Sequence, residues 1–285
     1  MSKKRRFVHS FWCAPAMLNE NNDRMKAVYD MWVFAMSALH IKRNGYEIVL
    51  HTDALGEEIF GAIPYDAIYR TLDIGIDPAF WTASKMTAHG AEPIGSIHID
   101  GDVFIKKPEI LAKIAEGDYD LCIERKTELH CNERIMEKML PYIEHTLPEW
   151  MSKTTNVAYN TGVVALNNAK HKKLFLDKAW EWGKLLTAAK DYKKNPTQSD
   201  LIIEMGWLRQ SAEHMGLKVL ELFQHDCDIT RWQTTDARIW SDVEGYEHNY
   251  KHTKYLLLPH IKQHIRETER PLYDKLMAVF KPKLY

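Results

Sequence analysis

The chain has few cysteines, no long apolar run and almost no net charge. Four cysteines among 285 residues are too few for a disulfide scaffold, and their spacing matches no paired metal site. No apolar run approaches the roughly 20 residues that a membrane-spanning helix needs. Lys and Arg number 38 and Asp and Glu 39, so no global charge attracts nucleic acid. Together these absences predict a globular cytoplasmic protein.

Two aspartates near the start of the second third of the chain stand one residue apart. They are Asp100 and Asp102 in the segment IHIDGDVFIKKP, with only Gly101 between them. In an extended backbone, residues i and i+2 point to the same side, so both carboxylates can face one cation. Magnesium and manganese ions take oxygen ligands and keep coordination positions for substrate phosphates. The pair therefore predicts a metal site for a diphosphate, with Gly101 leaving room for the substrate.

The same Asp-Gly pair is also a strong signal for a two-residue hairpin between alternating apolar segments. The flanking segments favour the other interpretation, because residues 78–89 and 109–116 both have the pattern of helices. A strand that ends in acidic residues and leads into a helix fits an α/β sheet, where ligands bind beyond the carboxyl ends of the strands.

Apolar periodicity predicts strands and helices in alternation along the chain. Strands are expected over residues 6–13, 47–52, 68–72, 97 onward, 119–124, 156–166, 218–222 and 255–258. Helices are expected over residues 23–43, 78–89, 109–116, 132–145, from about 167 to 182, and 197–215. The polar triplet at 160–162 is expected to break its strand. This order predicts an α/β fold with a mostly parallel sheet and helices on both faces, and no linker divides the single domain 1–285.

Four short segments in a fixed order resemble the GT-A fold glycosyltransferases of the glycogenin and lipopolysaccharide-galactosyltransferase type, including uncharacterised bacterial and phage relatives. They are a helical lysine, Lys85, ahead of the paired aspartates; the segment HIDGDVFIKKP itself; the segment AYNTGVVALNN; and the segment PTQSDLI. The chain departs from the family pattern at Thr197, where an aspartate is usual. It also lacks the Gly-Lys-Pro that follows the family's last conserved histidine.

The resemblance implies a GT-A-like, Rossmann-like fold and a metal-dependent transfer of a sugar from a nucleoside diphosphate sugar. It implies Mn²⁺ or Mg²⁺ as the cofactor, a UDP-sugar as the donor, and a hexosyltransferase of the retaining type. The nucleotide-binding half is expected at about residues 5–125, the acceptor-binding half at about 126–270, and a helical tail at 271–285. The acceptor is left open among a glycan, a lipid-linked glycan, a protein and a modified nucleic acid.

The residues that match the family's motifs are assigned by the resemblance. Asp100 and Asp102 would bind the metal, with His260, or His264 as the runner-up, completing its coordination. His260 is preferred because it would lie just beyond the strand expected at 255–258. The catalytic residues would be Asn160, Gln198 and Asp200, and the donor-binding residues Lys85 and Gly162, together with the two aspartates.

Each of these residues also has a structural explanation. Asp53 ends the second expected strand, where it could receive a ribose or base or simply form a turn. Gln198 and Asp200 could cap a helix, and Lys85 could lie on the surface. Glu124 and Asp200 are the candidates for a base, should the reaction invert the anomeric configuration.

Two other functions fit the expected fold. A nucleotidyltransferase would share the sheet and the metal but needs a Gly-rich, basic loop after the first strand, and the segment CAPAMLNENND is neither. The other is a non-catalytic protein that binds a sugar nucleotide or a glycan, because a fold does not establish a reaction.

Overall fold

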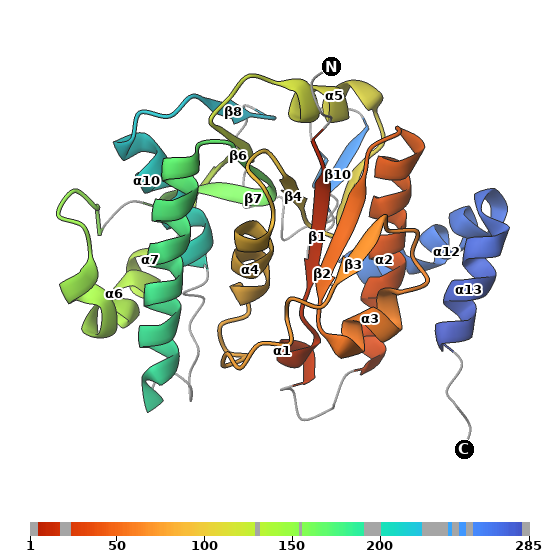
Figure 1. Ribbon diagram of the computed structural model, residues 1–285, viewed down its shortest axis with the longest axis horizontal. Helices are drawn as coiled ribbons and strands as arrows, with labels where there is room; N and C mark the ends of the chain where they lie inside the picture. Colours follow the sequence, from red (N-terminus) through yellow and green to blue (C-terminus); the bar gives the residue numbers. More distant parts are fainter. Residues whose placement is uncertain are drawn as a thin grey trace.

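The structure is a computed structural model that describes residues 5–17, 24–128, 132–153, 156–190, 201–223, 239–240, 245–248 and 253–280. Seven strands form one sheet in the order β3-β2-β1-β4-β7-β6-β8 (Figure 1). Their bounds are β1 Phe7–Phe11, β2 Ile48–Thr52, β3 Ala67–Tyr69, β4 Ile97–Ile99, β6 Leu121–Glu128, β7 Val157–Leu166 and β8 Val219–Glu221. Strands β3, β2, β1 and β4 are parallel, β7 is antiparallel to β4 and β6, and β8 is parallel to β6. The predicted α/β fold with a mostly parallel sheet is confirmed.

The first four strands follow the 3-2-1-4 order of a Rossmann-like half-sheet, in which the strand order reverses beside β1. Side chains alternate between two apolar cores, one on each face of the sheet. In β7, for example, Val163 packs into one core and Val164 into the other. Both faces therefore need helical cover, which accounts for the layers in Figure 1.

In the described part of the chain, the core on one face is built by five helices, of which the last two pack against the first. These are α2 Arg24–Arg43, α3 Ala54–Phe60, α5 Pro108–Glu116, α12 Leu258–Thr268 and α13 Arg270–Phe280. The other face is covered by α4 Ala83–Ala91, α6 Asn132–Ile143, α7 Ala169–Ala188, the π-helical turn η2 Ile202–Gly206 and α10 Trp207–His214. Three short helices complete the described part: α1 Cys13–Met17, η1 Glu144–Thr146 and α11 Thr253–Leu256.

A second, three-stranded sheet lies beside the first and has the order β5-β10-β9. Its strands are β5 Val103–Ile105, β10 Tyr246–His248 and β9 Ile239–Trp240. Strands β4 and β5 thus belong to different sheets, and the Asp-Gly turn between them passes the chain from one sheet to the other. The hairpin interpretation of this turn is wrong.

Of two other predictions about the secondary structure, one is wrong and one holds only for the strand pairing. Residues 255–258 are not a strand, because the chain forms α11 and then α12 there, with a proline in the first turn of α12. A run of four apolar residues does not distinguish a strand from a buried helical turn. The polar triplet at 160–162 does not end β7, which runs from Val157 to Leu166, but the pairing of β7 with β6 shifts register at this triplet.

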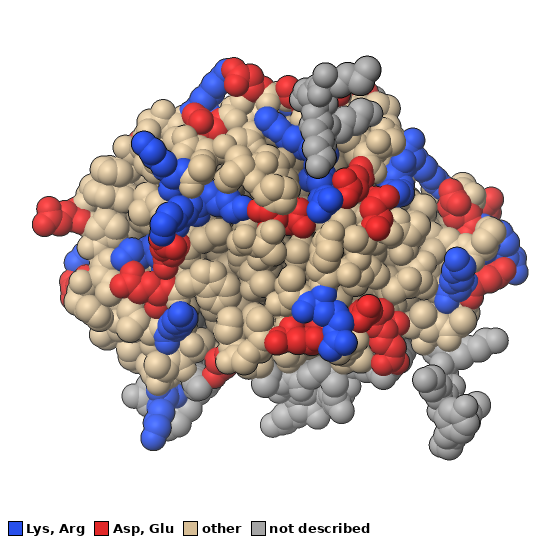
Figure 2. Space-filling view, viewed as in Figure 1, with Lys and Arg blue, Asp and Glu red and all other residues tan. Residues whose placement is uncertain are grey.

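Charged side chains of both signs are mixed on the face shown in Figure 2. Within the part of the chain that the structure describes, no helix is both long enough and apolar enough to cross a membrane.

Candidate metal centre

The turn between β4 and β5 carries Asp100 and Asp102. It is closed by the amide of Val103, which donates to the carbonyl oxygen of Asp100 at 3.0 Å. Gly101 is required here, because a Cβ at this position would lie 2.1 Å from the ring of Phe34 on α2. The missing side chain therefore makes room for a core aromatic ring, and not for a substrate as the sequence had suggested.

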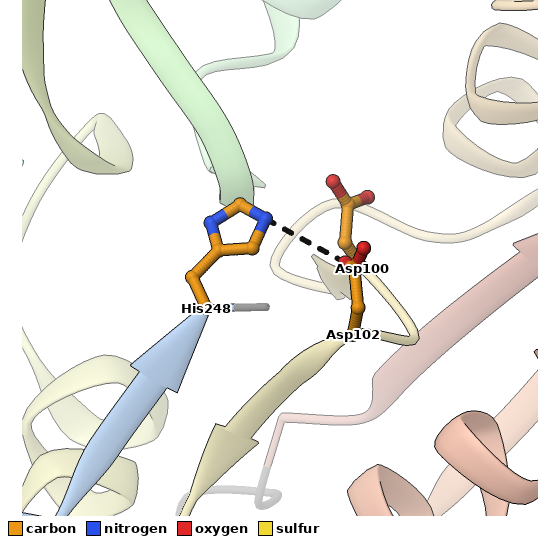
Figure 3. A group of neighbouring side chains, drawn as sticks. All are labelled: Asp100, Asp102 and His248. Carbon is orange, nitrogen blue, oxygen red and sulfur yellow. Dashed lines mark ion pairs between the residues drawn. The ribbon is translucent and has the colours of Figure 1, made fainter. Parts of the chain in front are cut away.

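Strand β10 brings His248 to the same turn. It runs antiparallel to β5 with His248 opposite Val103, so the imidazole lies next to Asp102, with Nε2 at 3.5 Å from Oδ1 (Figure 3). One ligand atom each from Asp100, Asp102 and His248 lies within 4.8 Å of the others. The histidine side chain is buried, while the two carboxylates are 24% and 18% exposed. The three side chains thus have a buried histidine on one side and two partly exposed carboxylates on the other.

A buried glutamate holds the other nitrogen of the imidazole. The pairing of β6 with β7 shifts register between Ile123 and Arg125, and Glu124 lies at this bulge. Its side chain has no exposed surface, and its Oε2 lies 2.7 Å from Nδ1 of His248. Gly162 of β7 leaves space for this pair, because a Cβ there would lie 2.3 Å from Glu124 Oε2 and 2.5 Å from His248 Cε1.

These contacts determine the protonation of the group in the metal-free protein. Burial opposes a charge on His248, but Glu124 and Asp102 outweigh it and raise the pKa of His248 to about 10. Burial also opposes a charge on Glu124, yet His248 keeps the pKa of Glu124 below its usual value. Burial, together with the charges of Asp102 and Glu204, raises the pKa of Asp100 to about 6 against the opposing effect of Lys85. A divalent cation would relieve this concentration of negative charge.

Lys85 lies on the other side of Asp100. Its Nζ is 2.8 Å from Asp100 Oδ1 and 2.5 Å from Oε1 of Glu204, a buried residue of the turn η2. Burial opposes the charge of Lys85, but the two carboxylates raise its pKa above the usual value. The hydroxyl of Thr161 donates to the same oxygen of Glu204 at 2.5 Å. The lysine assigned by the resemblance thus lies beside Asp100 and is largely buried, so it is not a surface lysine.

The remaining predicted residues have different surroundings. Asn160 is buried, and its Oδ1 accepts the amide hydrogen of Gly162 at 3.0 Å. Asp53 caps α3, because its Oδ1 accepts the amide hydrogen of Gly56 at 2.7 Å, and its Oδ2 accepts the amide hydrogen of Cys13, at the start of α1, at 2.9 Å. The structure thus shows the turn role of Asp53. Gln198 and Asp200 lie outside the described residues.

The structure does not bring His260 or His264 to the aspartates. His260 is exposed on α12, and Nε2 of His264 is 3.2 Å from Nη1 of Arg43 on α2. The position of His260 was deduced from the strand expected at 255–258, so that placement is wrong along with the strand. His248 is the histidine that lies beside Asp102.

Sequence reasoning missed His248 and Glu204. Strand β10 has only three residues, Tyr246–His248, too few for periodicity to identify. The sequence carries a weak signal, because Gly245 precedes the alternation of Tyr246, Glu247 and His248. In the structure, Gly245 has a φ of +94° and the three residues are buried, half-buried and buried. No sequence pattern marks Glu204, because its contact with Lys85 depends on the π-helical turn in which it lies.

The protein is therefore an α/β protein with a Rossmann-like sheet order and a group of two carboxylates and a histidine at the turn after β4. The chain belongs to the family of unknown function DUF6734, whose family model matches residues 5–280. No curated protein matches the chain. Among solved structures, it is similar to one titled as the apo structure of WbbM, a bifunctional glycosyltransferase, with a TM-score of 0.37 and 11% identity. That similarity covers 78% of this chain and 39% of the WbbM chain.

Proposed function

We propose that the protein is a metal-dependent glycosyltransferase that uses a nucleoside diphosphate sugar, such as a UDP-sugar, as its donor. The observation that carries this proposal is the convergence of Asp100, Asp102 and His248, whose ligand atoms lie within 4.8 Å of one another. Sugar transfer is assigned as the reaction because the motifs around Lys85 and Asn160 resemble those of GT-A glycosyltransferases.

The chemistry of the three side chains fits a divalent metal ion. Two carboxylates supply oxygen ligands and the imidazole supplies one nitrogen, a combination that suits Mn²⁺ better than Mg²⁺, which prefers oxygen ligands. Histidines that bind a metal almost always donate their other N–H to a carboxylate or carbonyl. Glu124 stands in that position behind His248, at 2.7 Å from Nδ1.

When bound, the ion would neutralise the negative charge that develops on the leaving diphosphate. The protein's own residues would prepare that step. Asp100 and Asp102 would hold the ion at the border between core and solvent, and His248 would fix it from the buried side. Lys85 adds a cation beside Asp100, at 2.8 Å. Asn160, Gln198 and Asp200 stay predicted contacts of the sugar.

The test is manganese binding and donor turnover in wild type, Asp102→Asn and Asp100→Asn. Each substitution removes one anionic ligand and preserves its size, so manganese affinity should fall about tenfold or more, as expected for 1.4 kcal/mol. Hydrolysis of the UDP-sugar should fall with it. Asp118→Asn is the matched control, because Asp118 is a surface aspartate paired with Lys218. Wild-type manganese affinity and hydrolysis in both site variants would refute the proposed metal site.

The products of the reaction separate this proposal from its alternatives. A glycosyltransferase releases a nucleoside diphosphate from the donor, whereas a nucleotidyltransferase makes pyrophosphate from a nucleoside triphosphate and a sugar phosphate. A binding protein releases neither. The anomeric configuration of the product, followed by NMR, tests the expectation that the enzyme is retaining.

A further inference from the structure

Lys85 is held between two carboxylates that come from different parts of the fold. Helix α4 supplies the lysine, the turn after β4 supplies Asp100, and the π-helical turn η2 supplies Glu204. The ammonium lies 2.8 Å from Asp100 Oδ1, 3.1 Å from Asp100 Oδ2 and 2.5 Å from Glu204 Oε1. The lysine side chain is only 12% exposed, so these contacts take the place of most of its hydration.

This arrangement conflicts with a divalent ion at Asp100 unless the lysine has a second partner. Both oxygens of Asp100 face the ammonium, and a metal ion that takes one of them would repel it at short range. A buried ammonium without a partner is costly. Glu204 removes that difficulty, because its carboxylate can retain the lysine after Asp100 turns to the metal.

Glu204 itself is held in one orientation. The hydroxyl of Thr161 donates to the oxygen that also accepts Lys85, at 2.5 Å, and the Glu204 side chain is 4% exposed. It lies in a π-helical turn, an irregularity that often occurs at functional sites. The carboxylate thus has no freedom to follow the lysine out toward the solvent.

We propose that Glu204 is the positioning residue of Lys85, and that it keeps the ammonium beside the metal site so that the lysine binds the diphosphate group of the donor. The proposal rests on the function proposed above. Lysine is a compact cation that binds phosphate as a point charge. Beside a metal ion held by Asp100, the lysine would offer its released N–H groups to a phosphate oxygen, while Glu204 keeps its contact.

A double-mutant cycle tests whether Glu204 acts through Lys85. The proteins are wild type, Lys85→Met, Glu204→Gln and the double variant, and the probes are UDP, GDP and inorganic pyrophosphate in saturating manganese, measured by calorimetry. Each single substitution should weaken diphosphate binding about tenfold, and the double variant should bind no more weakly than Lys85→Met, because interacting residues are not additive. Glu92→Gln is the matched control, since Glu92 is also buried but pairs with His51.

The outcomes distinguish two failures. Wild type that binds neither manganese nor any of the diphosphates would refute the proposed function, and the role of Glu204 with it. Wild type that binds both, with a Glu204→Gln variant equal to wild type or an additive double variant, would refute the role of Glu204 alone. If Glu204→Gln does not fold, Thr161→Val takes its place in the cycle. It removes the hydroxyl that orients Glu204, so it should also weaken diphosphate binding, by a smaller factor. This effect should be absent from a variant that also carries Lys85→Met.

Discussion

Oε2 of Glu124 lies 2.7 Å from Nδ1 of His248, on the opposite side of the imidazole from Asp102. The glutamate has no exposed surface and stays ionised, because His248 keeps its pKa below the usual value despite burial. With a pKa of about 10, His248 carries a proton on both nitrogens in the metal-free protein. When a metal ion displaces the proton of Nε2, Glu124 keeps the remaining proton on Nδ1 and leaves Nε2 free to bind the ion. A metal ligand needs this tautomer.

The first prediction concerns that pair. Glu124→Ala should lower manganese affinity about 10- to 100-fold, the usual cost of losing the partner behind a histidine ligand. Glu124→Gln should cost less, because its amide oxygen still accepts the N–H of His248 but carries no charge. Free manganese is measured by electron paramagnetic resonance.

Glu221→Gln is the control for the first prediction, since Glu221 lies on the neighbouring strand β8 and pairs with Lys126. Melting temperatures are recorded for every variant, because Glu124 also lies 3.5 Å from Arg125. A folded Glu124→Ala variant with wild-type manganese affinity would show that the glutamate serves packing alone.

The second prediction compares two histidines. His248→Ala should lower manganese affinity about tenfold or more, because it removes one of three ligands. His260→Ala should leave the affinity unchanged, because His260 is exposed on α12. Calorimetry with manganese measures both. Loss of affinity in His260→Ala without loss in His248→Ala would return the assignment to His260, and no loss in either variant would mean that neither histidine binds the metal.

The sequence predicted the sheet well and the candidate metal site in part, for reasons that lie in particular elements. Strands such as β2 are apolar throughout and bounded by turns, so their pattern is unambiguous. Asp100 and Asp102 are neighbours in the chain, and their shared direction follows from backbone geometry. His248 reaches them through the pairing of β10 with β5, across more than a hundred residues. Local periodicity carries no information about such a pairing.

Gly162 also shows that a local sequence pattern does not identify contacts between distant strands. The sequence assigned it to the donor by resemblance, and the structure shows that its missing side chain leaves space for Glu124 and His248. A glycine inside a strand signals a close approach of some other group. It does not say whether that group is a ligand or a pair of side chains from distant strands.

The third prediction follows from that contact. Gly162→Ala would place a Cβ 2.3 Å from Glu124 Oε2 and 2.5 Å from His248 Cε1, so both side chains must move. We expect a loss of stability of about 1 to 3 kcal/mol, as for other overpacked cores, and weaker manganese binding. Gly90→Ala is the control, because nothing lies within 4 Å of a Cβ there and Gly90 is inside α4. It should be neutral or stabilising by up to about 1 kcal/mol. Equal melting temperatures and manganese affinities for the two variants would contradict the steric argument.

The last prediction concerns acid stability and a histidine that binds no metal in this scheme. His9 of β1 is fully buried, and burial lowers its pKa to about 3, with only a partly opposing effect of the charge of Asp102. Ser37 donates its hydroxyl hydrogen to the carbonyl of Val103 and so accepts from Nε2 of His9 at 3.1 Å. Nδ1 then accepts from the hydroxyl of Tyr65 at 2.8 Å. The neutral imidazole is therefore satisfied on both sides, and a second proton would have no acceptor.

The sign of the pH dependence follows from these pKa values. Above about pH 6.5, His9 is neutral in both the folded and the unfolded chain and adds no pH dependence. Below it, the unfolded chain takes up a proton that the folded chain does not, so stability falls as the pH drops toward 3. Between about pH 7.5 and about pH 5.0 the loss from one such histidine is about 2 kcal/mol. Burial lowers the pKa of His40, His89 and His171 as well, so wild type should lose more than this amount.

Urea unfolding of wild type and His9→Gln at the two pH values measures how much of the lost stability comes from His9. The variant should lose about 2 kcal/mol less than wild type on acidification. An equal loss in the two proteins would mean that His9 takes up its proton in the folded state too, which its burial between Ser37 and Tyr65 opposes.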